Sequence, residues 1–376
     1  MKKVIVTSAW GAGYLEGGGM QWINLHYLAG LRALGFEPFW LDVLGPLKEG
    51  ARLSLSEMVD GFRMQCEQFG LGEHWAVLYD NREVFGMTED LLHSLCGDAA
   101  LLINLCGSLK NDELLRRIQR RAYFDLDPGF TQIWAHEWDM DFGKHNLFFT
   151  VGLNIGQPNF DIPLRGIEWQ TVAPPVALEY WPVQTDTGAA NFTTVGQWRG
   201  QCAVWKDEVY GPKNGEFLKF IELPRRTPQP IELALLIHET ETDDLAALRK
   251  NNWRLVNPHE AANGRDGFRS YVQRSRAEFS VAKHGYVKSQ SGWLSDRTVC
   301  YLASGRPVLV QDTGFGKHLP IGKGLLTFTT LEEAVRGIES INADYAAHSV
   351  AARKLAEDKL AAPKVLQSIL DRSGVR

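Results

Sequence analysis

The stretch VIVTSAWGAGYLEGGGMQW, residues 4–22, decides the fold class of this chain. It starts with Val4–Ala9, a short apolar run rich in β-branched residues, which is typical of a buried strand. Five glycines follow within nine residues. Apolar residues then recur at helical spacing from Met20 until Gly35, which predicts a helix. A strand, a glycine-rich loop and a helix in this order are typical of α/β units that bind phosphate groups.

The same alternation of short apolar strands and helices continues along the chain. We expect strands within residues 36–42, 99–107, 120–129 and 144–152 of the first half. A proline-rich linker follows at residues 172–190, with a hinge near Pro174–Pro182. The alternation then restarts. Strands are expected within residues 191–196, 231–238, 253–258, 271–285 and 306–312, and helices over residues 294–305, 331–341 and 344–360.

Short strands separated by helices predict parallel sheets covered by helices on both faces. The expected fold is therefore α/β, with two Rossmann-like, doubly wound parallel-sheet domains that face a central cleft. We expect an amino-terminal domain over residues 1–183 and a carboxyl-terminal domain over residues 184–350. A last helix within residues 351–376 crosses back to the first domain. Ligands of open α/β sheets bind beyond the carboxyl ends of the strands, so loops of both domains would surround one site.

Composition and charge argue against several classes of function. The chain has 376 residues, is 44% hydrophobic and carries a formal net charge of −5 with scattered acidic and basic residues. We therefore expect no nucleic-acid partner and no affinity for an anionic membrane. No apolar run approaches the roughly 18 residues of a membrane span. The five cysteines are widely spaced and form no CxxC motif, which favours free thiols and a cytoplasmic location.

The glycine-rich loop admits three interpretations. A dinucleotide fingerprint needs a third glycine after Gly11 and Gly13, but Glu16 stands there, and a carboxylate disfavours a pyrophosphate. Asp42 ends the next strand, where the acidic partner of an NAD ribose would lie, so an NAD-dependent Rossmann enzyme remains an alternative. No Walker lysine follows the glycines, which argues against a P-loop. The remaining interpretation is a connecting loop without a ligand.

The second half contains another candidate site, within residues 284–328. Ser295 is placed to cap a helix, and Ser291 and Gly292 precede it closely, so the first-turn amides and the helix dipole favour an anion. Arg297 and Lys288 add cationic groups that suit phosphate oxygens. The alternative is a capped surface helix with no ligand.

The end of that helix carries a resemblance to a known group of enzymes. The segment YLASGRPVLV, residues 301–310, followed by a short loop and GLLTF, residues 324–328, resembles the donor domain of GT-B-fold glycosyltransferases. Residues 17–41, with their glycines, helix and strand, resemble the amino-terminal domain of the same enzymes. The resemblance covers most of the chain as architecture. It implies a nucleotide-sugar donor in the second domain and an acceptor in the first.

One departure from that group concerns a pair of glutamates. A large retaining subgroup carries Glu, seven residues and Glu over this helix, and the second Glu holds the donor ribose. The alignment puts Gly292 and Cys300 at these two positions, and neither side chain can take that role. Asp296 lies one turn before Cys300 on the same face and is our candidate for a ribose or sugar hydroxyl. Retaining or inverting chemistry stays open.

The resemblance also implies which residues contact the donor. Arg199 and Trp198 follow the first strand of the second domain, and Lys283 and His284 follow a later one, although a surface arginine and a structural histidine are equally compatible with the pattern. The full expected donor set is Gly17, Gly18, Gly19, Trp198, Arg199, Lys283, His284, Lys288, Ser291, Gly292, Trp293, Ser295, Asp296, Arg297, Asp312 and Thr313.

Transfer to a hydroxyl with inversion needs a base on the acceptor side. Glu16 in the glycine-rich loop is the first candidate, Asp127 after an expected strand is the second, and His136 in WAHEWD is the third. A structural role is the alternative for each of them. The group HEWDMDFGKH matches no standard metal-ligand spacing, so we expect no metal and no cofactor.

The predicted function is a metal-independent glycosyltransferase that moves a sugar from a nucleotide-diphosphate sugar to a hydroxyl of a small molecule, a glycan or another acceptor. A nucleotide-sugar 2-epimerase on the same fold is the first alternative. An NAD-dependent enzyme and a non-catalytic sugar-nucleotide binder are the others. The sequence makes no prediction of the sugar, the base or the oligomeric state.

Overall fold

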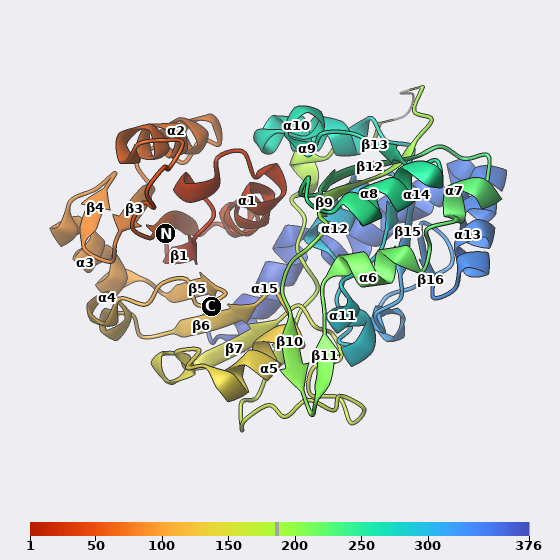
Figure 1. The fold of residues 1–376 in the computed structure, drawn as a ribbon. Coiled ribbons are helices and arrows are strands. Elements are labelled where there is room, and N and C mark those ends of the chain that lie inside the picture. Colours follow the sequence, from red (N-terminus) through yellow and green to blue (C-terminus); the bar gives the residue numbers. More distant parts are fainter. Residues whose placement is uncertain (185–187, 376) are drawn as a thin grey trace.

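The computed structural model describes residues 1–184 and 188–375 and contains two parallel sheets, one in each half of the chain (Figure 1). The first sheet has the order β4-β3-β2-β1-β5-β6-β7-β8, in which β4 alone runs antiparallel to its neighbour. Its strands are β1 (Lys3–Ser8), β2 (Glu37–Leu44), β3 (Trp75–Tyr79), β4 (Glu83–Phe85), β5 (Leu101–Leu105), β6 (Arg121–Asp125), β7 (Leu147–Thr150) and β8 (Gln170–Thr171).

The helices of this half connect the strands. They are α1 (Gly18–Ala33), α2 (Leu55–Gln68), α3 (Glu89–Asp98), α4 (Asp112–Arg117) and α5 (Phe130–Glu137). The expected stop of α1 is present, because Gly35 adopts φ +79° directly after the last turn. A capping box between Ser54 and Glu57 starts α2.

The second sheet has the order β13-β12-β9-β14-β15-β16 and is parallel throughout. This is the strand order 3-2-1-4-5-6 of the doubly wound nucleotide-binding fold. Its strands are β9 (Phe192–Gln197), β12 (Ile231–Leu236), β13 (Arg254–Leu255), β14 (Ala277–Ser280), β15 (Val308–Gln311) and β16 (Leu325–Phe328). An antiparallel hairpin, β10 (Ala203–Trp205) and β11 (Glu208–Tyr210), leaves this half and packs against α5. The sequence pattern gave no sign of it.

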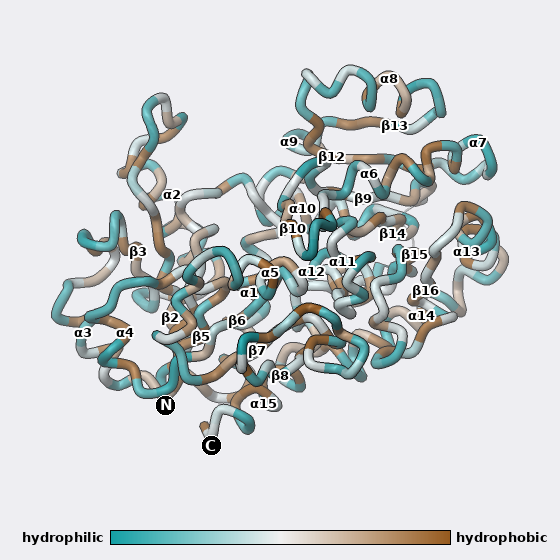
Figure 2. Tube along the Cα trace, turned by 60° about the horizontal axis from the view of Figure 1, so that its bottom comes forward, coloured by the Kyte–Doolittle hydropathy of each residue, from teal (hydrophilic) through white to brown (hydrophobic). Residues whose placement is uncertain are grey.

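The helices of the second half are α6 (Lys213–Leu218), α7 (Leu223–Arg226), α8 (Thr242–Lys250), α9 (Pro258–Ala261), α10 (Gly264–Gln273), α11 (His284–Ser289), α12 (Asp296–Ala303), α13 (Leu331–Ala343) and α14 (Tyr345–Leu355). Figure 2 shows β12 as an apolar segment, as expected for a strand covered on both faces.

The carboxyl-terminal end differs from the single helix expected over residues 344–360. A π-helical turn (Ala356–Leu360) continues α14, the backbone leaves helical geometry at Ala361, and a second helix, α15 (Ala362–Arg372), begins with Pro363 in its first turn. This second helix lies against the amino-terminal half, where Ala362 and Leu366 pack on Gly30 of α1 (Figure 1).

The proline-rich segment is not a free linker in its described part. Val176 is fully buried, and its backbone bonds to Leu360 and Ala362 at 2.8 and 2.9 Å. Residues 185–187 of the expected linker lie outside the described residues. The domain boundaries given above remain predictions.

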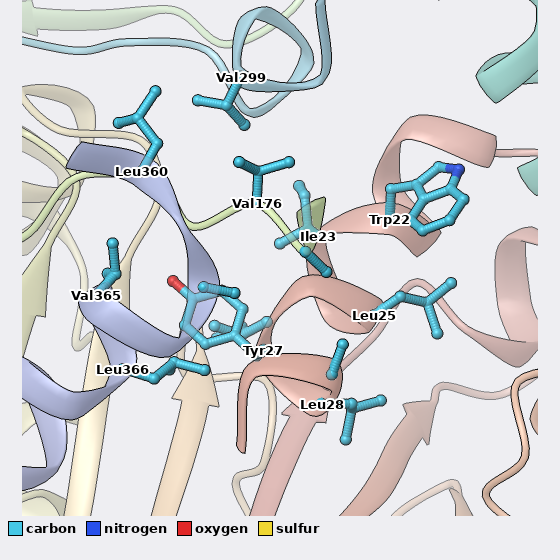
Figure 3. Packing of buried hydrophobic residues seen from close by; sticks show 14 of the residues in the cluster. Trp22, Ile23, Leu25, Tyr27, Leu28, Val176, Val299, Leu360, Val365 and Leu366 are labelled. Atoms are coloured by element: carbon cyan, nitrogen blue, oxygen red, sulfur yellow. The ribbon is translucent and has the colours of Figure 1, made fainter. Parts of the chain in front are cut away.

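One apolar core runs from α1 into the second half. Trp22, Tyr27 and Leu28 of α1 share it with Val176, with Val299 of α12 and with Leu366 of α15 (Figure 3). The two halves are therefore joined by buried apolar surface beneath the cleft, and not only by the connecting chain.

Candidate functional site

A cleft of about 410 Å³ lies between the two halves, a size typical of small-molecule sites. Its walls include residues at or directly after the carboxyl ends of β1, β6, β9, β12 and β14, the edge where ligands of open α/β sheets bind. The expected site residues that line it are Glu16, Gly17, Gly18, Gly19, Asp127, Arg199, Lys283, Trp293, Ser295, Asp296 and Arg297.

Arg297 is fixed in the cleft wall by three contacts. Its Nε donates to Oε1 of the fully buried Glu278 at 2.7 Å, and its Nη1 donates to the Val195 carbonyl at 2.8 Å. Its Nη2 donates to the Ser280 hydroxyl. The guanidinium is therefore held rigidly, and the Glu278 carboxylate balances its charge.

Lys213 faces the same part of the cleft and was missed by the sequence analysis. A Cβ built on Gly196 would lie 3.5 Å from Nη1 of Arg297 and 3.8 Å from Nζ of Lys213, so both cations lie beside this glycine. Lys213 is only 7% exposed and forms no hydrogen bond or ion pair with any residue of the described chain. Burial, Arg297 and Lys283 lower the pKa of Lys213 well below its usual value, and the negative charge of Glu278 offsets this shift only in part.

A buried cation without an acidic partner is unfavourable unless an anion joins it. The sequence carried one weak sign of Lys213, since a lysine at the first position of a helix opposes the helix dipole. Arg199 lies nearer the rim and is paired with Glu241 at 2.6 Å. Arg297 and Lys213 therefore place two basic groups side by side in the cleft wall.

Asp127 of the first half contacts three side chains of the second. Its carboxylate accepts hydrogen bonds from Nζ of Lys283 at 2.9 Å, from Nε2 of Gln201 at 3.3 Å and from the Tyr286 hydroxyl. Lys283 also donates to the amide oxygen of Gln201. We call Asp127, Gln201, Lys283 and Tyr286 the Asp127 cluster.

Asp296 starts α12 in the cleft wall. The Ser295 hydroxyl caps this helix by accepting from the Arg297 amide at 3.2 Å, as the sequence predicted. Burial raises the pKa of Asp296 to about 7, and the nearby charge of Asp127 acts in the same direction. Asp296 is thus a carboxyl group that changes its charge near neutral pH beside the cleft.

The glycine-rich loop lies on the cleft and contacts the second half. A Cβ on Gly18 would come within 2.0 Å of the Gly264 carbonyl oxygen, so only glycine permits this approach. The Gly264 amide donates to the Glu16 carbonyl at 2.9 Å, and the Glu16 carboxylate pairs with His259 at 3.4 Å with both side chains over 40% exposed. Glu16 therefore lies on the rim of the cleft.

The loop does not present a dinucleotide site. The two carboxylate oxygens of Asp42 accept hydrogen bonds from the Gly11 and Ala12 amides, both at 2.8 Å, and Asp42 is fully buried. Burial raises the pKa of Asp42 to about 6. Asp42 therefore holds the loop in its conformation. Neither its carboxylate nor the Gly11 and Ala12 amides are free for a ribose or a pyrophosphate.

Several expected site residues do not line the cleft. His136 lies at the end of α5, with its ring against Trp205 and its Nε2 3.2 Å from the Pro163 carbonyl. Trp198 is fully buried and donates to Asp244. Lys288 pairs with Glu208 at 3.1 Å. His284 accepts from the Gly211 amide through Nδ1 at 3.2 Å.

A second set of expected donor residues joins the two halves instead. Amides 153 and 154 of the first half donate to the carbonyls of Gly292 and Ser291, and the Gly292 amide donates to the Thr313 carbonyl at 2.7 Å. Asp312 accepts from the Gly314 amide and shapes the same loop. Ser291, Gly292, Asp312 and Thr313 thus position Trp293, which does line the cleft.

Within the described residues, no group of three or more His, Cys, Asp or Glu side chains is arranged to hold a metal ion. The same part of the chain contains no helix that is both long and apolar enough to cross a membrane.

The comparison with solved structures identifies the fold. No protein-family model and no curated sequence matches the chain. Among solved structures, it is similar to an alpha-glucosyltransferase in complex with UDP and a 13-mer DNA, with 12% identity, 100% of both chains covered and a TM-score of 0.62. It is also similar to HepE of Anabaena in complex with UDP-glucose, with 13% identity, 100% of both chains covered and a TM-score of 0.60.

A third similar structure is sucrose-phosphate synthase of Thermosynechococcus elongatus, with 10% identity, a TM-score of 0.54, and 99% of this chain and 98% of that one covered. The likeness extends over the whole length of each protein. The chain therefore has the GT-B glycosyltransferase fold, which confirms the fold prediction.

Proposed function

We propose that the protein is a glycosyltransferase that transfers a sugar from a UDP-sugar to a hydroxyl acceptor. The observation that carries this proposal is Lys213, a buried lysine in the cleft wall that forms no ion pair with any described residue, beside the rigidly held Arg297. The charge of Glu278 acts on Lys213, but Glu278 is already paired with Arg297. A diphosphate supplies the missing negative charge. UDP is the proposed carrier because the similar alpha-glucosyltransferase and HepE were crystallised with UDP or UDP-glucose.

The chemistry follows from these positions. As the bond between the anomeric carbon and the diphosphate oxygen breaks, negative charge grows on the departing UDP. Lys213 and Arg297 are held in the cleft wall before the reaction, so they stabilise that charge without reorganisation. We propose that this pair makes an added divalent metal unnecessary. Asp296 is the proposed partner of a ribose or sugar hydroxyl.

The acceptor enters from the first half, where Glu16 and Asp127 line the cleft and can accept a hydrogen bond from its hydroxyl. The negative net charge, and the acidic Glu16 at the rim, favour a small molecule or a glycan over a nucleic acid. The free cysteines Cys66, Cys96 and Cys300 are buried, which suits a reducing compartment and supports a cytoplasmic location.

The test is a thermal-shift screen with UDP-, GDP-, ADP- and dTDP-sugars, because a ligand that binds the folded state raises its stability. We expect stabilisation by UDP-sugars, followed by UDP release when a hydroxyl acceptor is added, with the same rate in EDTA. Epimerised UDP-sugar formed without any acceptor would instead identify a 2-epimerase. No stabilisation by any nucleotide sugar would refute the proposal.

A further inference from the structure

The Asp127 cluster joins the two halves across the cleft through a single carboxylate. Asp127 follows β6 of the first half, while Gln201, Lys283 and Tyr286 all belong to the second. Lys283 is the only formal positive charge among its three partners. The side chains of Lys283 and Asp127 are 21% and 23% exposed, so the ion pair is partly shielded from water and lines the cleft.

Lys283 also belongs to the cationic side of the cleft. It is close enough to Lys213 that its charge acts on that group, together with the charge of Arg297. Its side chain also lies against Gly200, in the loop that follows β9: a Cβ built on Gly200 would be 3.7 Å from Cε of Lys283. Lys283 therefore pairs with the Asp127 carboxylate and lines the same cleft as Lys213 and Arg297.

We propose that Lys283 is a counter-ion shared between Asp127 and the donor, so that donor binding frees Asp127 for the acceptor. This inference rests on the proposed function and adds an order of binding to it. In the empty cleft, Lys283 is held by Asp127. A bound diphosphate carries more negative charge than one carboxylate and lies beside Lys213 and Arg297, so it attracts the flexible Lys283 side chain.

The consequence concerns Asp127. Once Lys283 moves, the carboxylate keeps only the neutral donors Tyr286 and Gln201 and has an acceptor position open toward the cleft. A hydroxyl of the acceptor then donates a hydrogen bond to it. The donor therefore binds first, and an acceptor that arrives at the empty cleft meets a carboxylate that is already paired.

The test measures UDP affinity by calorimetry for the wild type, Asp127→Asn, Lys283→Met and the double variant. Asp127→Asn removes the competing charge, so UDP should bind about five- to tenfold more tightly, the effect of one partly buried ion pair. Lys283→Met should weaken binding. In the double variant the gain from Asp127→Asn should vanish, because the lysine that it releases is absent. Tyr286→Phe removes a neutral partner of Asp127 and should change affinity by less than about twofold.

A gain that persists without Lys283, or no gain at all, overturns the shared role. A wild type that binds no UDP refutes the proposed function and this inference with it, so the two failures differ.

Carboxyl labelling with a carbodiimide and an amine tests the wild type without substitution. UDP should accelerate labelling of Asp127 and leave the fully buried Asp125 unchanged. If UDP protects Asp127, the inference is wrong.

Discussion

Replacing Lys213 by methionine tests the charge at the centre of the proposed site. Methionine keeps the length and apolar stem of lysine but removes its charge. Burial and two cationic neighbours lower the pKa of Lys213 well below 10.5, so the folded chain binds its proton less tightly than the unfolded chain does. The penalty is fully present below the folded pKa and disappears as the pH rises toward 10.5. Lys213→Met should therefore be more stable than the wild type without ligand at neutral pH.

The same substitution should weaken UDP binding. A charge-assisted hydrogen bond contributes about 1.5–3 kcal/mol, which corresponds to about a 10- to 150-fold rise in Kd. At a UDP concentration of about 100 times the wild-type Kd, the wild type gains about 2.7 kcal/mol of stability. A variant that binds about 100-fold more weakly gains only about 0.4 kcal/mol at the same concentration.

Thermal denaturation with and without UDP measures both effects, and calorimetry measures the UDP affinity directly. Lys250→Met is the matched control, since Lys250 is exposed in the last turn of α8. Equal UDP affinity of Lys213→Met and the wild type would refute the assignment of the diphosphate to this cation.

Three further predictions concern charge and close contact. The pKa of Asp296 is raised to about 7, so its ionisation costs stability as the pH rises from about 4 to 7. Asp296→Asn should therefore raise the free energy of unfolding more at pH 8 than at pH 5, by at most about 4 kcal/mol, and should weaken UDP-sugar binding; denaturant titrations and calorimetry measure the two effects. Arg297→Met should cost about 3–5 kcal/mol by leaving Glu278 buried without its partner, and adding Glu278→Gln should restore denaturant stability but not UDP affinity. Gly18→Ala should destabilise by about 1–3 kcal/mol in thermal melts because its Cβ meets a backbone oxygen, whereas Gly45→Ala, with open space, should not.

The fold was predictable because it rests on local patterns. The buried β1, the helix that Gly35 ends and the Ser295 cap all follow from residues adjacent in sequence. The hairpin β10–β11 was not predictable, because its strands have three residues each and depend on packing against α5. The break at Ala361 likewise reflects a tertiary contact with Val176, which competes with the continuing helical pattern.

The site was predictable only where a motif marked it. Arg297 and Asp296 follow from the capped helix, and both line the cleft. Lys213, Gln201 and Tyr286 were missed because their importance depends on what lies opposite them in space. Lys213 is informative because it is buried and forms no ion pair within the described chain, and no sequence pattern displays such an absence.

The contacts between the two halves are of two kinds, and they respond differently to a ligand. Beneath the cleft, α1 packs with Val176, α12 and α15 in one apolar core, and separating these groups would expose buried surface at a high cost. Across the cleft, the Asp127 cluster and the pair of Glu16 with His259 are polar, and a bound anion or water can replace their partners. Large apolar interfaces disfavour relative motion of domains. A donor should therefore rearrange side chains at the cleft rather than open the base of the molecule.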